Sequence, residues 1–184
     1  LCEAAFLTGV EKNADVVVLA SYAPLFARLD YAQWTPDMIW FNDAECFPSP
    51  SFLVQKMYSR NMGDYVVENK LDDELFLADS RYKNIFHTVS YDTAENELIV
   101  KLVNPWDFDC VVTVDMDGFK PDYVKVHCII MGEAENEAYN SVNCQDNVKA
   151  YEFNIQAAFD GKVPDTGRFS LRAHTFSIFR IRCS

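Results

Sequence analysis

The feature that most constrains this chain is an unbroken apolar run at residues 16–20, part of the segment ADVVVLASYAPLF at residues 14–26. An antiparallel strand with one wet face would alternate apolar and polar residues, whereas five apolar residues in succession are typical of a strand buried on both faces. Such strands belong to parallel sheets covered by helices, and ligands bind beyond their carboxyl ends. The run therefore predicts a buried strand with a ligand site at and after Ser21.

Only one strand of this kind occurs, and the segments on either side of it predict helices. Residues 1–12 have apolar or small side chains at helical spacing, and the stripe expected to be buried comprises Cys2, Ala5, Phe6, Gly9 and Val10. Residues 49–62 predict a second helix, with Ser49 as its N-cap and Pro50 at its first position. This helix is expected to end at Gly63 and to bury one stripe of side chains, namely Leu53, Val54, Met57 and Tyr58.

From Asp64 onward, short β-rich runs alternate with turn signals at a spacing of about ten residues. Strands are expected at residues 65–67, 75–78, 85–91, 97–104, 110–116, 123–131, 149–155 and 169–182. This spacing is typical of an antiparallel β-sandwich or jelly roll. The predicted fold is therefore mainly β. A helix–strand–helix piece at residues 1–62, with a long aromatic-rich loop at residues 24–50, precedes a β-sandwich at residues 63–184.

The composition excludes several classes of partner. A formal net charge of −12 argues against nucleic acid and against anionic membrane surfaces, and no apolar run approaches the ~20 residues of a membrane span. The six cysteines include no C-x-x-C pair and are interpreted as buried free thiols. The three histidines lie on separate predicted strands, so no metal site and no cofactor are predicted. Calcium binding by Asp115 and Asp117, or by the stretch with Glu133, Glu135 and Glu137, stays an alternative, and a solvated loop is the simpler interpretation of that stretch.

Several spaced motifs together carry a resemblance to a known family. They are EAAFLTG at residues 3–9, the segment at residues 14–26, WTPDMIWF at residues 34–41, PSFLVQ at residues 50–55, ELIVKLVNP at residues 97–105 and NSVN at residues 140–143. In this order they closely resemble the C-terminal part of glycoside hydrolase family 51 α-L-arabinofuranosidases, over most of the chain. Members of that family pair a (β/α)8 barrel with a C-terminal jelly-roll sandwich. The resemblance implies that residues 1–12, 15–22 and 49–62 are the end of the seventh helix, the eighth strand and the eighth helix of such a barrel.

The resemblance also implies an activity, the retaining hydrolysis of terminal non-reducing α-L-arabinofuranosyl residues in arabinan- or arabinoxylan-type polysaccharides. Retention needs two carboxyl groups about 5–5.5 Å apart, a nucleophile and a general acid/base. In the family these are glutamates at the ends of the fourth and seventh strands, which fall upstream of Leu1, and no residue here matches either motif. No catalytic residue is therefore assigned, and the chain, which looks like a fragment, is expected to be inactive alone. The acids of the long loop are interpreted as solvated: Asp30, Asp37, Asp43 and Glu45.

Three residues are expected to contact the sugar. By its place in PSFLVQ, Gln55 resembles a family glutamine that hydrogen-bonds the arabinose ring, a role that suits an amide because it both donates and accepts. A surface glutamine on an amphipathic helix is the alternative. Tyr22 follows the predicted strand, where the pocket floor should lie. Trp34, like Trp40, is suited either to stacking on a sugar or to packing the barrel rim, and Trp34 is included in the predicted site.

The expected partner is an oligo- or polysaccharide that contains arabinofuranosyl residues, bound by the full-length enzyme, with a homo-oligomer as a further expectation. Without barrel neighbours, residues 16–20 would expose apolar surface, so the helices are expected either to pack on the sandwich or to recruit a second copy. The alternative function is a non-catalytic carbohydrate-binding or structural β-sandwich module. The compartment stays open between a secreted, periplasmic or cytoplasmic location in a polysaccharide-degrading bacterium.

Overall fold

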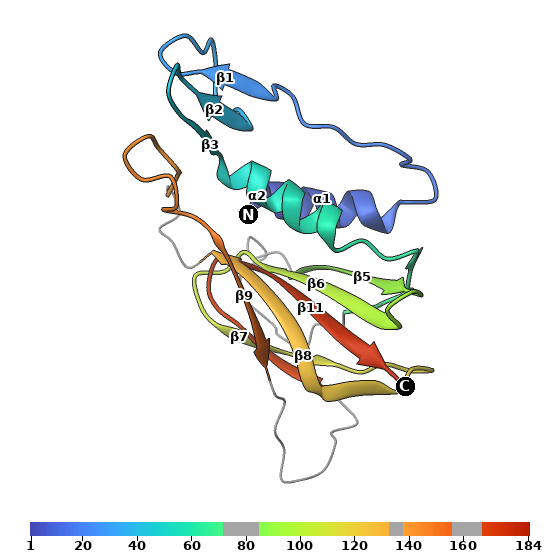
Figure 1. The fold of residues 1–184 in the computed structure, drawn as a ribbon. Helices are drawn as coiled ribbons and strands as arrows, with labels where there is room; N and C mark the ends of the chain where they lie inside the picture. Colours follow the sequence, from blue (N-terminus) through green and yellow to red (C-terminus); the bar gives the residue numbers. More distant parts are fainter. Residues whose placement is uncertain (72–84, 133–137, 156–166) are drawn as a thin grey trace, which may run out of the picture.

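The computed structural model describes residues 1–71, 85–132, 138–155 and 167–184. Two helices, α1 (Cys2–Lys12) and α2 (Pro50–Arg60), lie side by side across one face of a six-stranded sheet, and a two-stranded sheet lies on the other side (Figure 1). The six antiparallel strands run in the order β4 (Tyr65–Val66), β5 (Phe86–Asp92), β6 (Glu97–Asn104), β11 (Thr175–Cys183), β8 (Pro121–Gly132) and β9 (Ala150–Ile155). The two-stranded sheet pairs β7 (Cys110–Val114) with β10 (Gly167–Leu171). This arrangement confirms the predicted antiparallel β-sandwich and the two predicted helices.

The six-stranded sheet is apolar on both faces because it is covered on both faces. Alternate residues of β6 and β11 point toward the helices and share one hydrophobic core with them, namely Ile99, Val103, Phe176 and Ile178 packed with Ala4, Leu7, Val54 and Met57. The intervening residues form a second core with the two-stranded sheet: Val100, Leu102, Phe179 and Ile181 packed with Val112, Phe169 and Leu171. The helices thus pack on the sandwich, one of the two outcomes expected for them. The division into domains at residue 62 stays a prediction.

Helix α2 begins as the sequence predicts. The Ser49 hydroxyl accepts a hydrogen bond from the backbone N–H of Phe52, and Pro50 takes the first helical position, where its missing N–H costs nothing. Val54, Met57 and Tyr58 are buried. The helix ends at Arg60 with Asn61 as its C-cap, not at Gly63. Gly63 instead allows a close approach to β5, because a Cβ there would lie 2.7 Å from the Tyr91 backbone.

Helix α1 forms where it is predicted, but it buries a different face. The buried residues are Ala4, Leu7 and Thr8, whereas the predicted stripe of Cys2, Ala5, Phe6, Gly9 and Val10 is exposed or half-buried. Phe6 keeps 66% of its surface exposed. The helix carries small or apolar residues on two faces, and contact with the sandwich selects the face with Ala4 and Leu7.

The strand predicted at residues 15–22 is absent from the described structure. After α1 the chain passes through turns to Val16 and continues without regular secondary structure to Leu25. Val18 and Leu19 are 91% and 84% exposed. A strand needs backbone partners on at least one edge, and no described segment pairs with these residues.

Two further segments differ from expectation. The predicted long loop contains a small sheet of β1 (Phe26–Arg28), β2 (Ile39–Phe41) and β3 (Cys46–Pro48), in which β1 and β2 are parallel and β2 and β3 antiparallel. The strand predicted at residues 169–182 is two strands in different sheets, because His174 adopts a left-handed φ of 51° and turns the chain between β10 and β11. The strand predicted at residues 75–78 lies outside the described residues. The remaining predicted strands match β4 to β9 within a few residues.

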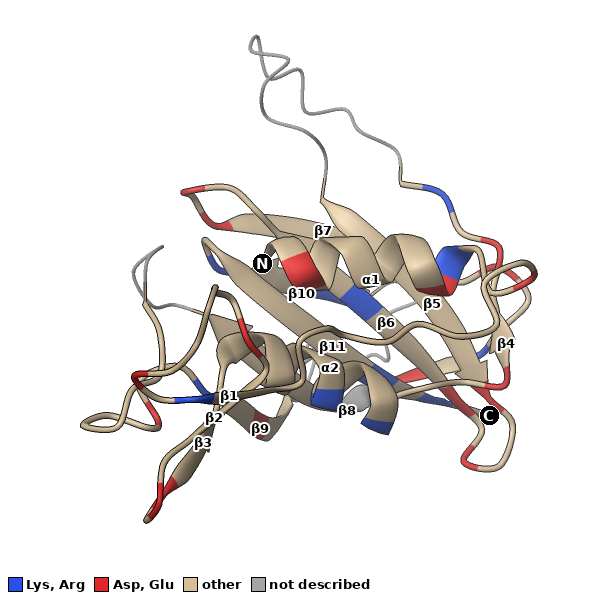
Figure 2. Cartoon of the chain, turned by 90° about the horizontal axis from the view of Figure 1, so that it is seen from above, with Lys and Arg blue, Asp and Glu red and all other residues tan. Residues whose placement is uncertain are grey.

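A buried ion pair lies between α1 and the sheet. The side chain of Lys101, in the middle of β6, is completely buried, and its Nζ contacts Oε1 of Glu11, which is 16% exposed. The same Nζ lies 5.2 Å from the centroid of the Tyr58 ring. Figure 2, which looks down on the helices, shows basic colour on β6 beneath α1. The contact fixes α1 to the sheet through charge as well as through apolar packing.

Candidate functional site

The structure does not bring the three predicted sugar-contacting residues together. Tyr22 is half-buried in the irregular segment after α1, and Trp34, before β2, is 65% exposed. Gln55 lies on α2 and donates a hydrogen bond from Nε2 to Oε1 of Glu3 on α1. In the described part of the chain, no hydrogen bond or ring contact joins any two of the three. Their contact with a sugar therefore stays a prediction.

The described structure has a groove at the amino-terminal end of α2. One wall is the β1–β3 layer, which contributes Asp37, Trp40 and Phe47, and the opposite wall is the sandwich segment at residues 139–143. The N-cap Ser49 and the first two residues of the helix, Pro50 and Ser51, also line the groove. Its volume is about 700 Å³, within the range of roughly 300–1,000 Å³ that is typical of small-molecule sites.

Asn140 joins the two walls of this groove. Its Nδ2 donates to the carbonyl oxygens of Pro48, at the end of β3, and of Val148, both at 3.1 Å. Its Oδ1 accepts from the backbone N–H of Val148 at 2.7 Å. The side chain is thereby fully used while only 5% of the residue is exposed. One hydrogen bond thus holds the segment at residues 139–143 against β3, and two hold it to Val148 of the sandwich, so the groove is formed before any ligand arrives.

Asp37 is a residue of the groove whose burial the sequence does not predict. The interpretation as a solvated loop acid is correct for Asp30, Asp43 and Glu45, which are exposed, but wrong for Asp37, which is 2% exposed. Its Oδ2 is buried and has no hydrogen-bond partner among the described residues. Burying an ionisable oxygen without a hydrogen bond costs free energy. A group that donates a hydrogen bond to this carboxylate would recover part of that cost.

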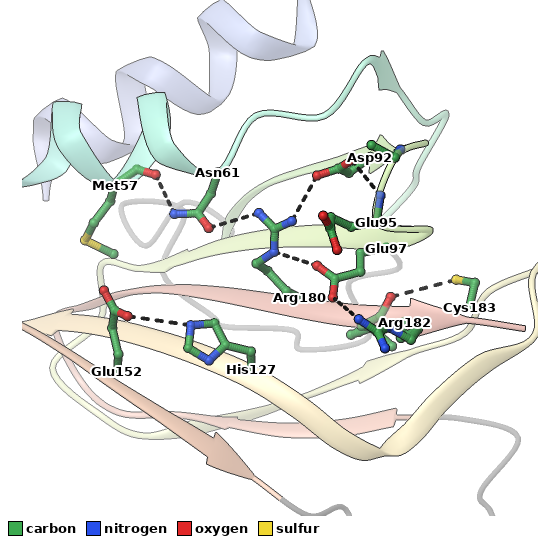
Figure 3. Close-up of polar contacts among 12 residues, drawn as sticks. Met57, Asn61, Asp92, Glu95, Glu97, His127, Glu152, Arg180, Arg182 and Cys183 are labelled. Atoms are coloured by element: carbon green, nitrogen blue, oxygen red, sulfur yellow. Dashed lines mark hydrogen bonds and ion pairs between the residues drawn. The ribbon is translucent and has the colours of Figure 1, made fainter.

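A second polar cluster fixes α2 to the edge of the sandwich (Figure 3). Arg180 on β11 donates from Nε to Oε2 of Glu97 at 2.7 Å and from Nη2 to Oδ2 of Asp92 at 3.0 Å. Its Nη1 donates to Oδ1 of Asn61 at the end of α2, at 3.4 Å, and Asn61 Nδ2 donates to the Met57 carbonyl. Each of the three guanidinium nitrogens donates to an acceptor of the protein, so this cluster is interpreted as a structural joint rather than as a ligand site.

The remaining candidate groups are the possible metal ligands and the six cysteines. In the part of the chain that the structure describes, no group of three His, Cys, Asp or Glu side chains is placed to hold a metal ion, and residues 133–137 lie outside that part. All six thiols are free, but only Cys128 and Cys183 are buried, which corrects the interpretation of all six as buried. Neither described helix is long and apolar enough to cross a membrane.

Comparison with known proteins gives one consistent match. The model of a family described as the α-L-arabinofuranosidase C-terminal domain matches residues 1–170. α-L-Arabinofuranosidase A of Aspergillus niger is 33% identical over 160 residues, which are 86% of this chain and 23% of that protein. An extracellular exo-α-L-arabinofuranosidase of Streptomyces chartreusis is 57% identical over 70 residues, which are 38% of this chain and 8% of that protein.

Solved structures show the same fold. An arabinose-bound GH51 α-L-arabinofuranosidase superposes with a TM-score of 0.83 at 22% identity, and the match covers 98% of this chain and 27% of that one. The arabinose complex of the Thermotoga maritima α-L-arabinofuranosidase superposes with a TM-score of 0.78 at 14% identity, covering 97% of this chain and 36% of that one. The chain spans only 8% and 23% of the lengths of the two curated relatives.

Proposed function

Because this chain belongs to the family of α-L-arabinofuranosidase C-terminal domains, we propose that it is the carboxyl-terminal part of a retaining α-L-arabinofuranosidase. The complete enzyme removes terminal non-reducing arabinofuranosyl residues from polysaccharides such as arabinan or arabinoxylan. The observation that carries the proposal is the family match over residues 1–170, which spans the helices and nearly all of the sandwich. The similarity of fold along 98% of the chain supports it.

In this proposal the chain contributes structure and part of the sugar-binding surface, and the two catalytic glutamates come from the rest of the enzyme. The apolar residues after α1 become the last strand of a barrel, with parallel neighbours that this chain does not supply. Their high exposure supports that role, because an apolar run that is buried on both faces of a sheet must be exposed when the sheet is absent. Tyr22 and Trp34 then lie on the segment that follows the strand, where barrel enzymes bind substrate.

Gln55 has a more restricted role in the same proposal. Its amide nitrogen already donates to Glu3, so a contact with sugar would use the amide oxygen or would compete with that bond. A Gln55→Glu change therefore tests two functions at once, the helix–helix contact and the sugar contact, and it is a poor probe of substrate binding alone.

The proposed activity is tested on the complete protein. It should release arabinose from 4-nitrophenyl α-L-arabinofuranoside, and proton NMR of the first product should show the α-anomer, as a double displacement requires. The 184-residue chain alone should release none. Initial formation of the β-anomer would contradict the retaining mechanism, and binding of arabino-oligosaccharides without any hydrolysis by the complete protein would favour a non-catalytic carbohydrate-binding module.

A further inference from the structure

We propose that the groove at the amino-terminal end of α2 binds a segment of a neutral carbohydrate chain, with Asp37 accepting hydrogen bonds from its hydroxyl groups. The choice of ligand class rests on the proposed function. The location rests on the groove itself, which is formed by the β1–β3 layer and by residues 139–143.

The first argument is that Asp37 is prepared for a partner that the described chain does not supply. Other carboxylates at the sheet are neutralised by cations, as Asp92 and Glu97 are by Arg180. Asp37, which lines the groove, is less exposed than either side chain, yet its Oδ2 is buried without a hydrogen bond among the described residues. A rotation of the carboxylate toward the groove would let a ligand hydroxyl satisfy that oxygen and recover part of the cost of burying it.

The second argument concerns the chemistry of the lining. Beside the single carboxylate, the residues that line the groove include the aromatic Trp40 and Phe47 and the polar Thr35 and Asn143. This combination of an apolar face with a few convergent polar groups suits a sugar, which presents C–H faces to aromatic rings and hydroxyl groups to polar atoms. The net charge of −12 disfavours an anionic ligand. A bound metal ion is disfavoured as well, because Asp37 is the only carboxylate described in the lining.

The third argument is that the groove is rigid. Asn140 ties the far wall to the end of β3 through its bond to the Pro48 carbonyl, and to the sandwich through Val148. The Ser49 cap fixes the start of α2 at the base of the groove. A ligand therefore pays little to order the walls, which favours measurable affinity from a small contact area.

The test is a calorimetric titration of the 184-residue chain with α-1,5-linked arabinotriose, comparing Asp37→Asn with Asp43→Asn. Asp43 is the matched control, because it lies in the same layer but its side chain is 85% exposed and pairs with Arg28. Asp37→Asn should weaken binding by about 10- to 100-fold, the effect of losing a hydrogen bond to a charged group, and Asp43→Asn should leave it unchanged. The thermal midpoint of the free Asp37→Asn chain should be equal to or above that of the parent, because an unpaired buried charge is removed.

Three outcomes would overturn the assignment: no binding of arabinotriose by the parent chain, equal affinity in the Asp37→Asn variant, or loss of binding together with a lowered thermal midpoint. The last result would mean that Asp37 has a structural partner. Failure of the groove assignment can be told apart from failure of the proposed function. If the groove does not bind but the complete protein still cleaves 4-nitrophenyl α-L-arabinofuranoside, only the groove assignment falls. If binding depends on Asp37 and cleavage is absent, only the enzymatic proposal falls.

Discussion

Replacing Glu11 with alanine should lower the free energy of unfolding by about 3–5 kcal/mol, the range observed when one partner of a buried ion pair is removed. The reason is the environment of Lys101, whose side chain is fully buried and whose ammonium group has the Glu11 carboxylate as its ion-pair partner. Burial lowers the pKa of Lys101, and the attraction of Glu11 opposes that shift. Without Glu11, the lysine must either remain charged without a partner or lose its proton on folding, and both alternatives cost free energy.

Urea unfolding followed by circular dichroism measures this effect. The control is Asp15→Ala, which removes an exposed acid just beyond the same helix and should change the stability by less than about 0.5 kcal/mol. The double variant Glu11→Leu with Lys101→Met should recover most of the loss, because well-packed apolar side chains often replace a buried pair without cost. A loss below about 1 kcal/mol in Glu11→Ala would show that water reaches Lys101 and that the pair does not hold α1 to the sheet.

The second large effect is a loss of stability at alkaline pH that originates in the core of the sandwich. Burial raises the pKa of the Cys128 thiol from 9.0 to about 12. Between these two values the unfolded chain releases this proton and the folded chain keeps it, so the unfolded state binds fewer protons and stability falls as pH rises. At about 1.4 kcal/mol per pH unit, the loss from this thiol is small at pH 9, about 3 kcal/mol at pH 11 and roughly 4 kcal/mol above pH 12. Burial also raises the pKa of Tyr58 and of Tyr123, which adds to the loss above pH 10.

The measurement is the free energy of unfolding between pH 8 and pH 11 for the parent and for Cys128→Ala. The variant should be less stable at pH 8, because a buried side chain is truncated, but its stability should fall less steeply above pH 9. Cys144→Ala removes an exposed thiol and should keep the steep alkaline loss of the parent. Equal slopes in the parent and in Cys128→Ala would contradict the burial of Cys128 within the folded sandwich.

Local signals made much of the fold predictable. The Ser49-Pro50 helix start acts within a few residues, and α2 and the strands β5 and β6 form where the sequence indicates. The errors concern choices that depend on distant contacts. The face that α1 buries is decided by the sheet beneath it, and the break at His174 depends on a left-handed residue that no glycine or proline marks. The apolar run at residues 16–20 is a strand only where other strands flank it.

The groove was harder to predict than the fold, for a physical reason. Asp37 follows a proline in a long loop, a pattern that indicates an exposed acid. The groove that it lines is formed by segments more than 90 residues apart, which the bond from Asn140 to Pro48 joins. The motifs that carry the family resemblance include residues 34–41 of the loop and the NSVN segment at residues 140–143, but the sequence does not reveal that these two segments face each other across the groove. The proposed roles of Tyr22, Trp34 and Gln55 stay predictions.

The most direct test of the central claim, that this chain completes the barrel of a longer enzyme, is hydrogen exchange at the backbone amides of residues 18–21. In the 184-residue chain these residues lie in an irregular segment in which Val18 and Leu19 are almost fully exposed, so their amides should exchange rapidly. In the complete protein they should be protected by several orders of magnitude, because they become part of a central strand. Rapid exchange in both proteins would contradict the claim.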